Sequence, residues 1–184
     1  MRPIPLLALL TVCASSLAAQ SGNWPTYGND AGGLKYSPLA DVNRETVARL
    51  KPAFTWDANE QPIRASDGQK AARPGLFQAT PLAINDTLFF PTPYNRVIAL
   101  DATTGKFVWR TADPVQVTQL ATDPVSGSQF PLVRWGHDFG AVTSANGVVF
   151  AGSTGGAPIA SINVPGYPGA FFALDAATGR ILWQ

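Results

Sequence analysis

The chain has 184 residues, of which 46% are apolar and 14% are charged, with 17 Gly and 16 Pro. This balance supports a buried core and excludes wholesale disorder, which a Gly and Pro share of roughly 25–30% would mark. A net charge of +1 gives no sign of the basic surface that binds nucleic acid or an anionic membrane. A single Cys and a single His exclude an internal disulfide framework, a multi-cysteine metal cluster and a zinc site built on paired histidines.

Residues 1–18 are predicted to be a secretory signal peptide. Arg2 precedes an apolar run of about ten residues, and the small side chains of Ser16 and Ala18 fit a cleavage site after Ala18. An uncleaved anchor is one alternative, although the run is shorter than the roughly 20 residues that span a bilayer. A lipoprotein signal at Cys13 is another, which the bulky Val12 disfavours. We therefore expect one periplasmic or secreted domain over residues 19–184.

Helical periodicity is nearly absent after the signal peptide. The one candidate is a short helix over residues 41–50, in which Val42, Val47 and Leu50 share a face and Asp41 or Asn43 caps the N-terminus. Elsewhere, short apolar runs alternate with Gly, Pro, Asn and Asp, which is typical of an all-β chain.

Two dipeptides predict tight β-hairpins. Asn85-Asp86 and Asn146-Gly147 each separate two short apolar runs. Both suit the two-residue turns that require positive φ, and Asn-Gly is the stronger signal.

The chain contains a repeat, since segment 97–109 returns as segment 170–183. Both copies carry the frame Ala-x-Asp-x-x-Thr-Gly-x-x-x-Trp. In this frame the Asp and Thr can bond backbone amides across a turn, the Gly supplies positive φ, and the Trp is an apolar peg that docks against a neighbouring unit. We assign the frame a structural role, because repetition at fixed spacing is a signature of the fold. Its residues are Asp101, Thr104, Gly105 and Trp109, and then Asp175, Thr178, Gly179 and Trp183.

Each copy follows a predicted hairpin, so the repeating unit has four strands and one aromatic motif, as a β-propeller blade has. A third, degenerate copy ends at Trp56. The intervals between the tryptophans exceed a blade of about 40–50 residues. We therefore expect insertions at 59–75, 111–130 and 155–169, gathered on one face of the repeats where ligands bind.

The predicted fold class is all-β, an incomplete β-propeller of about three blades. Because propellers close with four to eight blades, we interpret the chain as the N-terminal fragment of a longer protein.

Several ordered segments carry a family resemblance. Segments 24–30, 33–39 and 50–56, followed by 78–82 and 92–101, resemble the mature N-terminus of quinoprotein dehydrogenases. The repeated frame resembles the tryptophan-docking motif of that family. These are secreted, eight-bladed enzymes that use pyrroloquinoline quinone (PQQ) to oxidise alcohols or sugars, so the resemblance implies a PQQ-dependent oxidoreductase.

The resemblance also implies a cofactor arrangement and partners. PQQ would lie near the propeller axis with Ca²⁺ as a Lewis acid, and a sugar, polyol or alcohol would deliver hydride to the quinone while an Asp acts as base. Electrons would then pass to an acceptor such as a cytochrome c or a membrane quinone. No cysteine follows Cys13, so the adjacent-cysteine pair of many alcohol-oxidising members is absent, which favours a sugar or polyol.

Two residues carry over from the family as candidate cofactor contacts. Gln78 stands where the family has a Glu that faces the quinone, and its amide can still hydrogen-bond an oxygen without carrying charge. Arg134 is the nearest match to an Arg beside the quinone, although segment 135–138 departs from the family sequence. A strand-end hydrogen bond for Gln78 and a solvated salt bridge for Arg134 are the structural alternatives. No catalytic or metal-binding residue is assigned.

Other polar residues receive no chemical role. His137 and Asp138 are adjacent, and adjacent side chains of a strand point to opposite faces, which disfavours an acid–base pair. Asp67, Asp86 and Asp123 lie in turn-like contexts.

A second function class stays open, which is a non-catalytic PQQ-repeat propeller acting as an envelope scaffold or ligand-binding domain. The uncharged Gln78 favours that alternative slightly.

Overall fold

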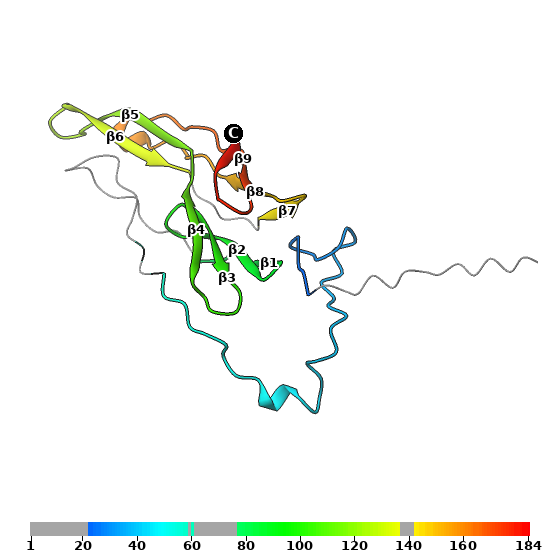
Figure 1. Cartoon of the computed structure of the whole chain (residues 1–184). Coiled ribbons are helices and arrows are strands. Elements are labelled where there is room, and N and C mark those ends of the chain that lie inside the picture. Colours follow the sequence, from blue (N-terminus) through cyan, green and yellow to red (C-terminus); the bar gives the residue numbers. More distant parts are fainter. Residues whose placement is uncertain (1–21, 59, 61–76, 137–141) are drawn as a thin grey trace, which may run out of the picture.

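The computed structural model describes residues 22–58, 60, 77–136 and 142–184. Within these residues the chain forms ten β-strands and two single-turn 3-10 helices, which confirms the all-β prediction (Figure 1). The predicted signal peptide, the pair His137-Asp138 and Asp67 lie outside the described residues. So does all of the predicted 59–75 insertion except Glu60.

The first sheet is an antiparallel four-stranded unit. Its strands run in the order β1 (Leu82–Ile84), β2 (Thr87–Thr92), β3 (Arg96–Asp101) and β4 (Phe107–Ala112). Asn85 and Asp86 connect β1 to β2 with φ values of 47° and 59°, so the hairpin turn predicted from this dipeptide is confirmed.

The second sheet repeats this arrangement. Its strands are β7 (Thr143–Ala145), β8 (Val148–Ser153), β9 (Ala170–Asp175) and β10 (Ile181–Trp183), paired in chain order. Asn146 and Gly147 form the β7–β8 turn with φ values of 50° and 78°. Each copy of the sequence repeat therefore forms the last two strands of one four-stranded sheet, and a hairpin before it supplies the first two.

The two remaining strands form a hairpin between these sheets, β5 (Gln116–Thr122) and β6 (Gln129–Trp135). Most of it falls in the predicted 111–130 insertion. The Asp123 carboxylate accepts hydrogen bonds from the Val125 and Ser126 amides, and Gly127 has φ 71°, so the β5–β6 turn repeats the geometry of the Asp-x-x-Thr-Gly turns. The turn-like role assigned to Asp123 is thus confirmed.

The predicted helix over residues 41–50 is wrong except for one 3-10 turn, η1 (Val47–Arg49). Val42, Val47 and Leu50 are all exposed. The Asn43 side chain does accept hydrogen bonds from the Glu45 and Thr46 amides at 3.0 Å, as a capping residue would. A cap alone does not sustain a short helix whose apolar face has nothing to pack against in this part of the chain.

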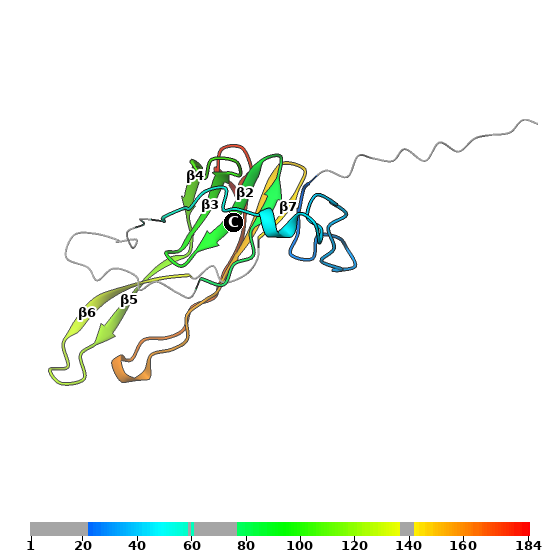
Figure 2. The ribbon, with the colours of Figure 1, turned by 90° about the horizontal axis from the view of Figure 1, so that it is seen from below.

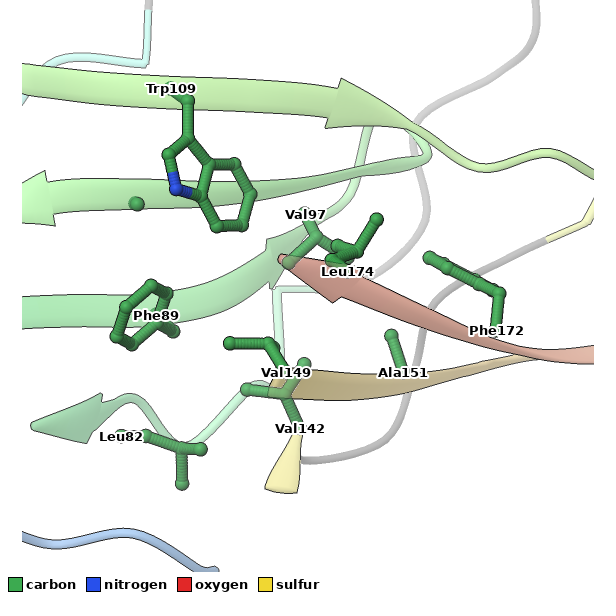
Figure 3. Packing of buried hydrophobic residues seen from close by; sticks show 10 residues of the cluster. Leu82, Phe89, Val97, Trp109, Val142, Val149, Ala151, Phe172 and Leu174 are labelled. Atoms are coloured by element: carbon green, nitrogen blue, oxygen red, sulfur yellow. The ribbon is translucent and has the colours of Figure 1, made fainter. Parts of the chain in front are cut away.

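The main core lies between the two four-stranded sheets (Figure 3). The first sheet contributes Leu82, Phe89, Val97, Ala99 and Trp109, and the second contributes Val149, Ala151, Phe172 and Leu174, together with Val142 just before it. The two sheets therefore pack face to face, as successive blades of a propeller do.

The aromatic peg of the first repeat docks on the turn of the second. Trp109 is only 8% exposed, and its indole N–H donates to the Ala176 carbonyl at 2.9 Å. Thr111 donates from its hydroxyl to the Gly179 carbonyl at 2.6 Å. A Cβ on Gly179 would lie 2.6 Å from the indole ring, and Gly179 has φ 71°, so both contact and conformation require glycine here.

The degenerate copy uses a different aromatic residue for this contact. Phe54 lies against Gly105, where an added Cβ would be 2.8 Å from Phe54 Cε2. Trp56, at the position equivalent to Trp109, instead packs edge-on against Phe90 and Phe107, at 5.4 and 6.0 Å between ring centroids.

The face of the second sheet that carries Trp183, which corresponds to the Trp109 face of the first sheet, is not covered by other described residues. Phe171 stacks on Phe150 and contacts Trp183, and Phe171 and Trp183 are 54% and 60% exposed.

Candidate functional site

Both candidate cofactor contacts belong to the end of the sheets opposite the docking turns. At this end Thr92 pairs with Arg96, Arg96 pairs with Ala112, and Ser153 pairs with Ala170. The start of β1, the β2–β3 turn, the end of β4 and the β8–β9 connection therefore meet here. We call this end the rim.

Gln78 is at the rim because it precedes β1, and it is exposed. The residues on either side of it are anchored by apolar contacts. Phe77 packs edge-on against Phe90 at 5.9 Å between ring centroids, and Ala79 packs against the small cluster that contains Ile98. The backbone is thereby held while the amide, which can donate and accept, faces solvent.

Arg134, near the end of β6, is engaged by other protein groups. Its Nη1 donates to the Pro165 carbonyl at 3.1 Å and to Gln119 Oε1 at 3.3 Å, and its Nη2 donates to the Ala157 carbonyl at 2.7 Å. The guanidinium also lies over the Tyr167 ring, 4.6 Å from its centroid. These contacts are to carbonyl groups and an aromatic face rather than to a carboxylate.

Glu60 is a buried acidic residue at the rim that the sequence analysis missed. Its exposed fraction is 5%, and Thr92 donates from its hydroxyl to Glu60 Oε2 at 2.7 Å. Arg96 Nη1 lies 3.9 Å from the same oxygen. Burial lowers the pKa of Arg96, and the charge of Glu60 opposes that shift. Among the described residues, Glu60 Oε1 is buried and accepts no hydrogen bond.

A second buried acid occupies the equivalent place in the next repeat. Asp113 follows Trp109 by four positions, as Glu60 follows Trp56. Its Oδ1 accepts the Val115 amide at 2.6 Å. Its Oδ2 lies 2.8 Å from the place where a Cβ on Gly136 would sit, and that Cβ would also collide with the Ser153 hydroxyl.

Ser153 ends β8 as Thr92 ends β2. In each repeat, therefore, a buried carboxylate lies beside a hydroxyl at the end of the second strand of the following sheet. The signal for Glu60 was the spacing Trp-x-x-x-acid, an extension of the docking frame that the sequence analysis did not use.

Asn95 joins the rim of the first sheet to the segment after β6. It is buried, has φ 62°, and donates from its side chain to the Gly136 carbonyl. Its own carbonyl accepts the Asp113 amide at 2.8 Å, and the Gly136 amide donates to Val115 at 3.0 Å. Trp135 is buried beside this network. Hydrogen bonds among buried polar groups therefore join the rim of the first sheet to the base of the β5–β6 hairpin.

In residues 22–58, 60, 77–136 and 142–184, no three His, Cys, Asp or Glu side chains come together to hold an ion. No helix there is long and apolar enough to cross a membrane. The rim thus contains an exposed amide, Gln78, and a set of buried polar groups, and neither a catalytic base nor an ion site is assigned within it.

Comparisons with known proteins identify similar sequences. The family described as PQQ glucose/ethanol/alcohol dehydrogenase, β-propeller domain, matches residues 24–128. The dehydrogenase subunit of alcohol dehydrogenase (quinone) from Gluconobacter oxydans is 29% identical over 177 residues, which cover 94% of this chain and 18% of that protein. Quinoprotein glucose dehydrogenase from Escherichia coli is 35% identical over 89 residues, which cover 47% of this chain and 10% of that protein.

Among solved structures, quinohemoprotein alcohol dehydrogenase from Comamonas testosteroni is 20% identical with a TM-score of 0.45, covering 91% of this chain and 28% of that one. The chain thus spans a fifth or less of the two curated relatives.

Proposed function

Because the chain belongs to the PQQ-dependent glucose/ethanol/alcohol dehydrogenase β-propeller family, we propose that it is part of a dehydrogenase that oxidises a sugar, polyol or alcohol by hydride transfer to PQQ. The observation that carries the proposal is the family match over residues 24–128, which includes the first complete sheet. Relatives named for alcohol and for glucose both match, so the substrate class is proposed at that breadth.

PQQ is a flat quinone that bears carboxylates, and when bound it accepts the two electrons of the substrate C–H bond as hydride. The exposed Gln78 amide fits such a group, since it can donate to a quinone or carboxylate oxygen without a like-charge penalty. We propose Gln78 as a cofactor contact.

Ca²⁺ is proposed on family grounds, as the ion that would accompany PQQ. The described residues provide no group of three metal-binding side chains, so no ligand for the ion is assigned among them.

The proposed setting is the periplasm or the exterior, after removal of residues 1–18. The Arg2-led apolar run and the small side chains of Ser16 and Ala18 support export. Electrons from the reduced quinone would pass to a cytochrome c or a membrane quinone. One matching relative is named 1-butanol dehydrogenase (cytochrome c), from Thauera butanivorans, which supports the first of these acceptors.

The second candidate function is a non-catalytic propeller that serves as an envelope scaffold or ligand-binding domain. Two observations favour it. The residue at position 78 is a neutral amide, and the guanidinium of Arg134 is already engaged by the Pro165 and Ala157 carbonyls.

Reconstitution separates the two functions. The complete protein that contains this chain is incubated with PQQ and Ca²⁺ and tested for dye reduction with aldoses, polyols and alcohols. The dehydrogenase proposal expects PQQ-dependent reduction with at least one of these substrates. PQQ binding without turnover, or no binding at all, would favour the non-catalytic alternative.

A further inference from the structure

Two segments project from the rim and contact each other. We call β5–β6, residues 116–135, the hairpin arm, and residues 155–169 the loop arm. The loop arm contains η2 (Ala160–Ile162) and two isolated bridges, Gly156 with Tyr167 and Ile159 with Val164. Figure 2 shows both arms extending together away from the two four-stranded sheets. The structure thus places two insertions predicted from sequence side by side.

The two arms are joined mainly by polar contacts. Gln119 Nε2 donates to the Pro165 carbonyl at 3.0 Å, and the Tyr167 hydroxyl donates to the Trp135 carbonyl at 2.5 Å. Arg134 adds its bonds to the Pro165 and Ala157 carbonyls and its position over the Tyr167 ring. Arg134 therefore contacts three residues of the loop arm from one position on the hairpin arm.

Arginine is suited to this position because its planar guanidinium can donate in two directions while its face stacks on an aromatic ring. The loop arm makes room for it through Gly156, since a Cβ there would collide with both the Tyr167 ring and the guanidinium. A lysine ammonium is a point charge on a flexible stem and cannot reproduce the planar fork and the stacking.

Much of the outer part of the hairpin arm is exposed, although Ala121 is buried. Leu120 is exposed, and Val125 in the β5–β6 turn is 95% exposed. A two-stranded hairpin is at best marginally stable in water. The contacts to the loop arm therefore help to hold the hairpin arm in place.

We propose that Arg134 is a positioning residue that holds the two arms together as one wall, and that this wall selects substrates by size at the rim. The second clause rests on the proposed dehydrogenase function. The geometry favours this placement because the hairpin arm follows β4, the loop arm joins β8 to β9, and both connections leave the sheets at the end where Gln78 precedes β1.

The first test measures the wall independently of catalysis. Hydrogen–deuterium exchange of the complete protein is compared for wild type, Arg134→Ala and Arg134→Lys. The proposal expects both variants to raise exchange at least tenfold in residues 116–135 and also in 155–169, with the β2–β3 and β8–β9 cores unchanged. Arg180→Ala, at an exposed arginine near the docking turn, is the matched control and leaves both arms protected. Faster exchange in only one arm, or in neither, would overturn the positioning role.

Tyr167→Phe separates two of the contacts between the arms. It removes the hydroxyl bond to the Trp135 carbonyl and keeps the ring under the guanidinium. We expect a rise in exchange that is smaller than for Arg134→Ala and still present in both arms.

The second test measures PQQ affinity by fluorescence quenching and kcat/KM for a monosaccharide and a disaccharide. If the two arms form a wall that selects substrates, Arg134→Ala should leave PQQ affinity within twofold. It should shift the ratio of the two kcat/KM values at least fivefold, and the change should appear in KM. An unchanged ratio would overturn the substrate role of the wall. A tenfold loss of PQQ affinity with unchanged exchange would show that Arg134 contacts the cofactor instead. If the wild type turns over no substrate, the dehydrogenase proposal fails while the exchange result still decides the positioning role.

Discussion

Replacement of Gly179 by Ala is expected to destabilise the packing between the two four-stranded sheets. The added methyl would lie 2.6 Å from the Trp109 ring, well inside van der Waals contact, and the indole is held there by its bond to the Ala176 carbonyl. Neither side can yield freely, because Trp109 is buried against Phe89 in the main core.

The magnitude follows from two separate costs. A non-glycine residue in the left-handed conformation costs roughly 1–2 kcal/mol, and Gly179 has φ 71°. Overpacking of a close contact costs roughly a further 1–3 kcal/mol. The free energy of unfolding should therefore fall by about 2–5 kcal/mol.

Gly127→Ala is the matched control. Gly127 also has φ 71° and lies in the same kind of Asp-x-x-Ser-Gly turn, but a Cβ there would meet nothing within 4 Å. Only the conformational cost of about 1–2 kcal/mol applies to it.

The assay is urea unfolding of the complete protein and its two variants, followed by the tryptophan emission maximum. Gly179→Ala should lower the midpoint more than Gly127→Ala and should red-shift emission in the folded state as the indole becomes hydrated. Equal midpoints for the two variants, with unchanged emission, would refute the docking interpretation.

Three further predictions concern the rim and the docking turns. In a double-mutant cycle of Glu60→Leu and Thr92→Val measured by urea unfolding, the buried bond between the two side chains should give a coupling of about 1.5–3 kcal/mol, and additive effects would contradict that pairing. Gln78→Ala should weaken PQQ binding about two- to twelve-fold in a fluorescence titration, as the loss of one neutral hydrogen bond does, and unchanged affinity would remove Gln78 from the site. The Thr104 hydroxyl and then the Thr104 amide lower the pKa of Asp101, so this group stabilises the fold above its unfolded pKa near 3.9 and ceases to do so as the pH falls through the lower folded value. Asp101→Asn should therefore reduce the dependence of stability on pH below about pH 4 in acid-unfolding experiments, and an unaltered profile would count against the linkage.

The parts of the fold predicted well from sequence are those that local chemistry specifies. The β7–β8 turn requires positive φ, which Asn146 and Gly147 tolerate better than most residues do. The Asp-x-x-Thr-Gly frame forms its turn from side chains within four residues of one another. Repetition then indicated that two such units occur, and the docking of Trp109 followed from its place in the frame.

The parts of the fold that were not predicted depend on contacts between residues distant in sequence, or on a turn motif that was recognised in only two of its three occurrences. The apolar positions of segment 41–50 predict a helix with one apolar face. Periodicity does not tell whether another element packs on that face, and Val42 is exposed in the structure. The β5–β6 hairpin was assigned to an insertion although Asp123 and Gly127 repeat the turn signal of the frame.

The candidate site was predictable only in part. Gln78 was a candidate only through the family resemblance, and the structure has it before β1, at the rim. The Ala157 and Pro165 carbonyls that accept from Arg134 lie 23 and 31 residues further along the chain, so no local pattern reveals them. Glu60 was overlooked because the stretch around it is rich in turn-forming residues.

The docking of Trp109 also has a consequence for synthesis on the ribosome. The carbonyl that receives its indole N–H belongs to a residue 67 positions later in the chain. At a translation rate of about 5–20 residues per second, several seconds pass between synthesis of Trp109 and synthesis of the residue that accepts its hydrogen bond. The first repeat therefore leaves the exit tunnel with the Trp109 side chain uncovered, and a chaperone is most needed in the interval before the second repeat is made.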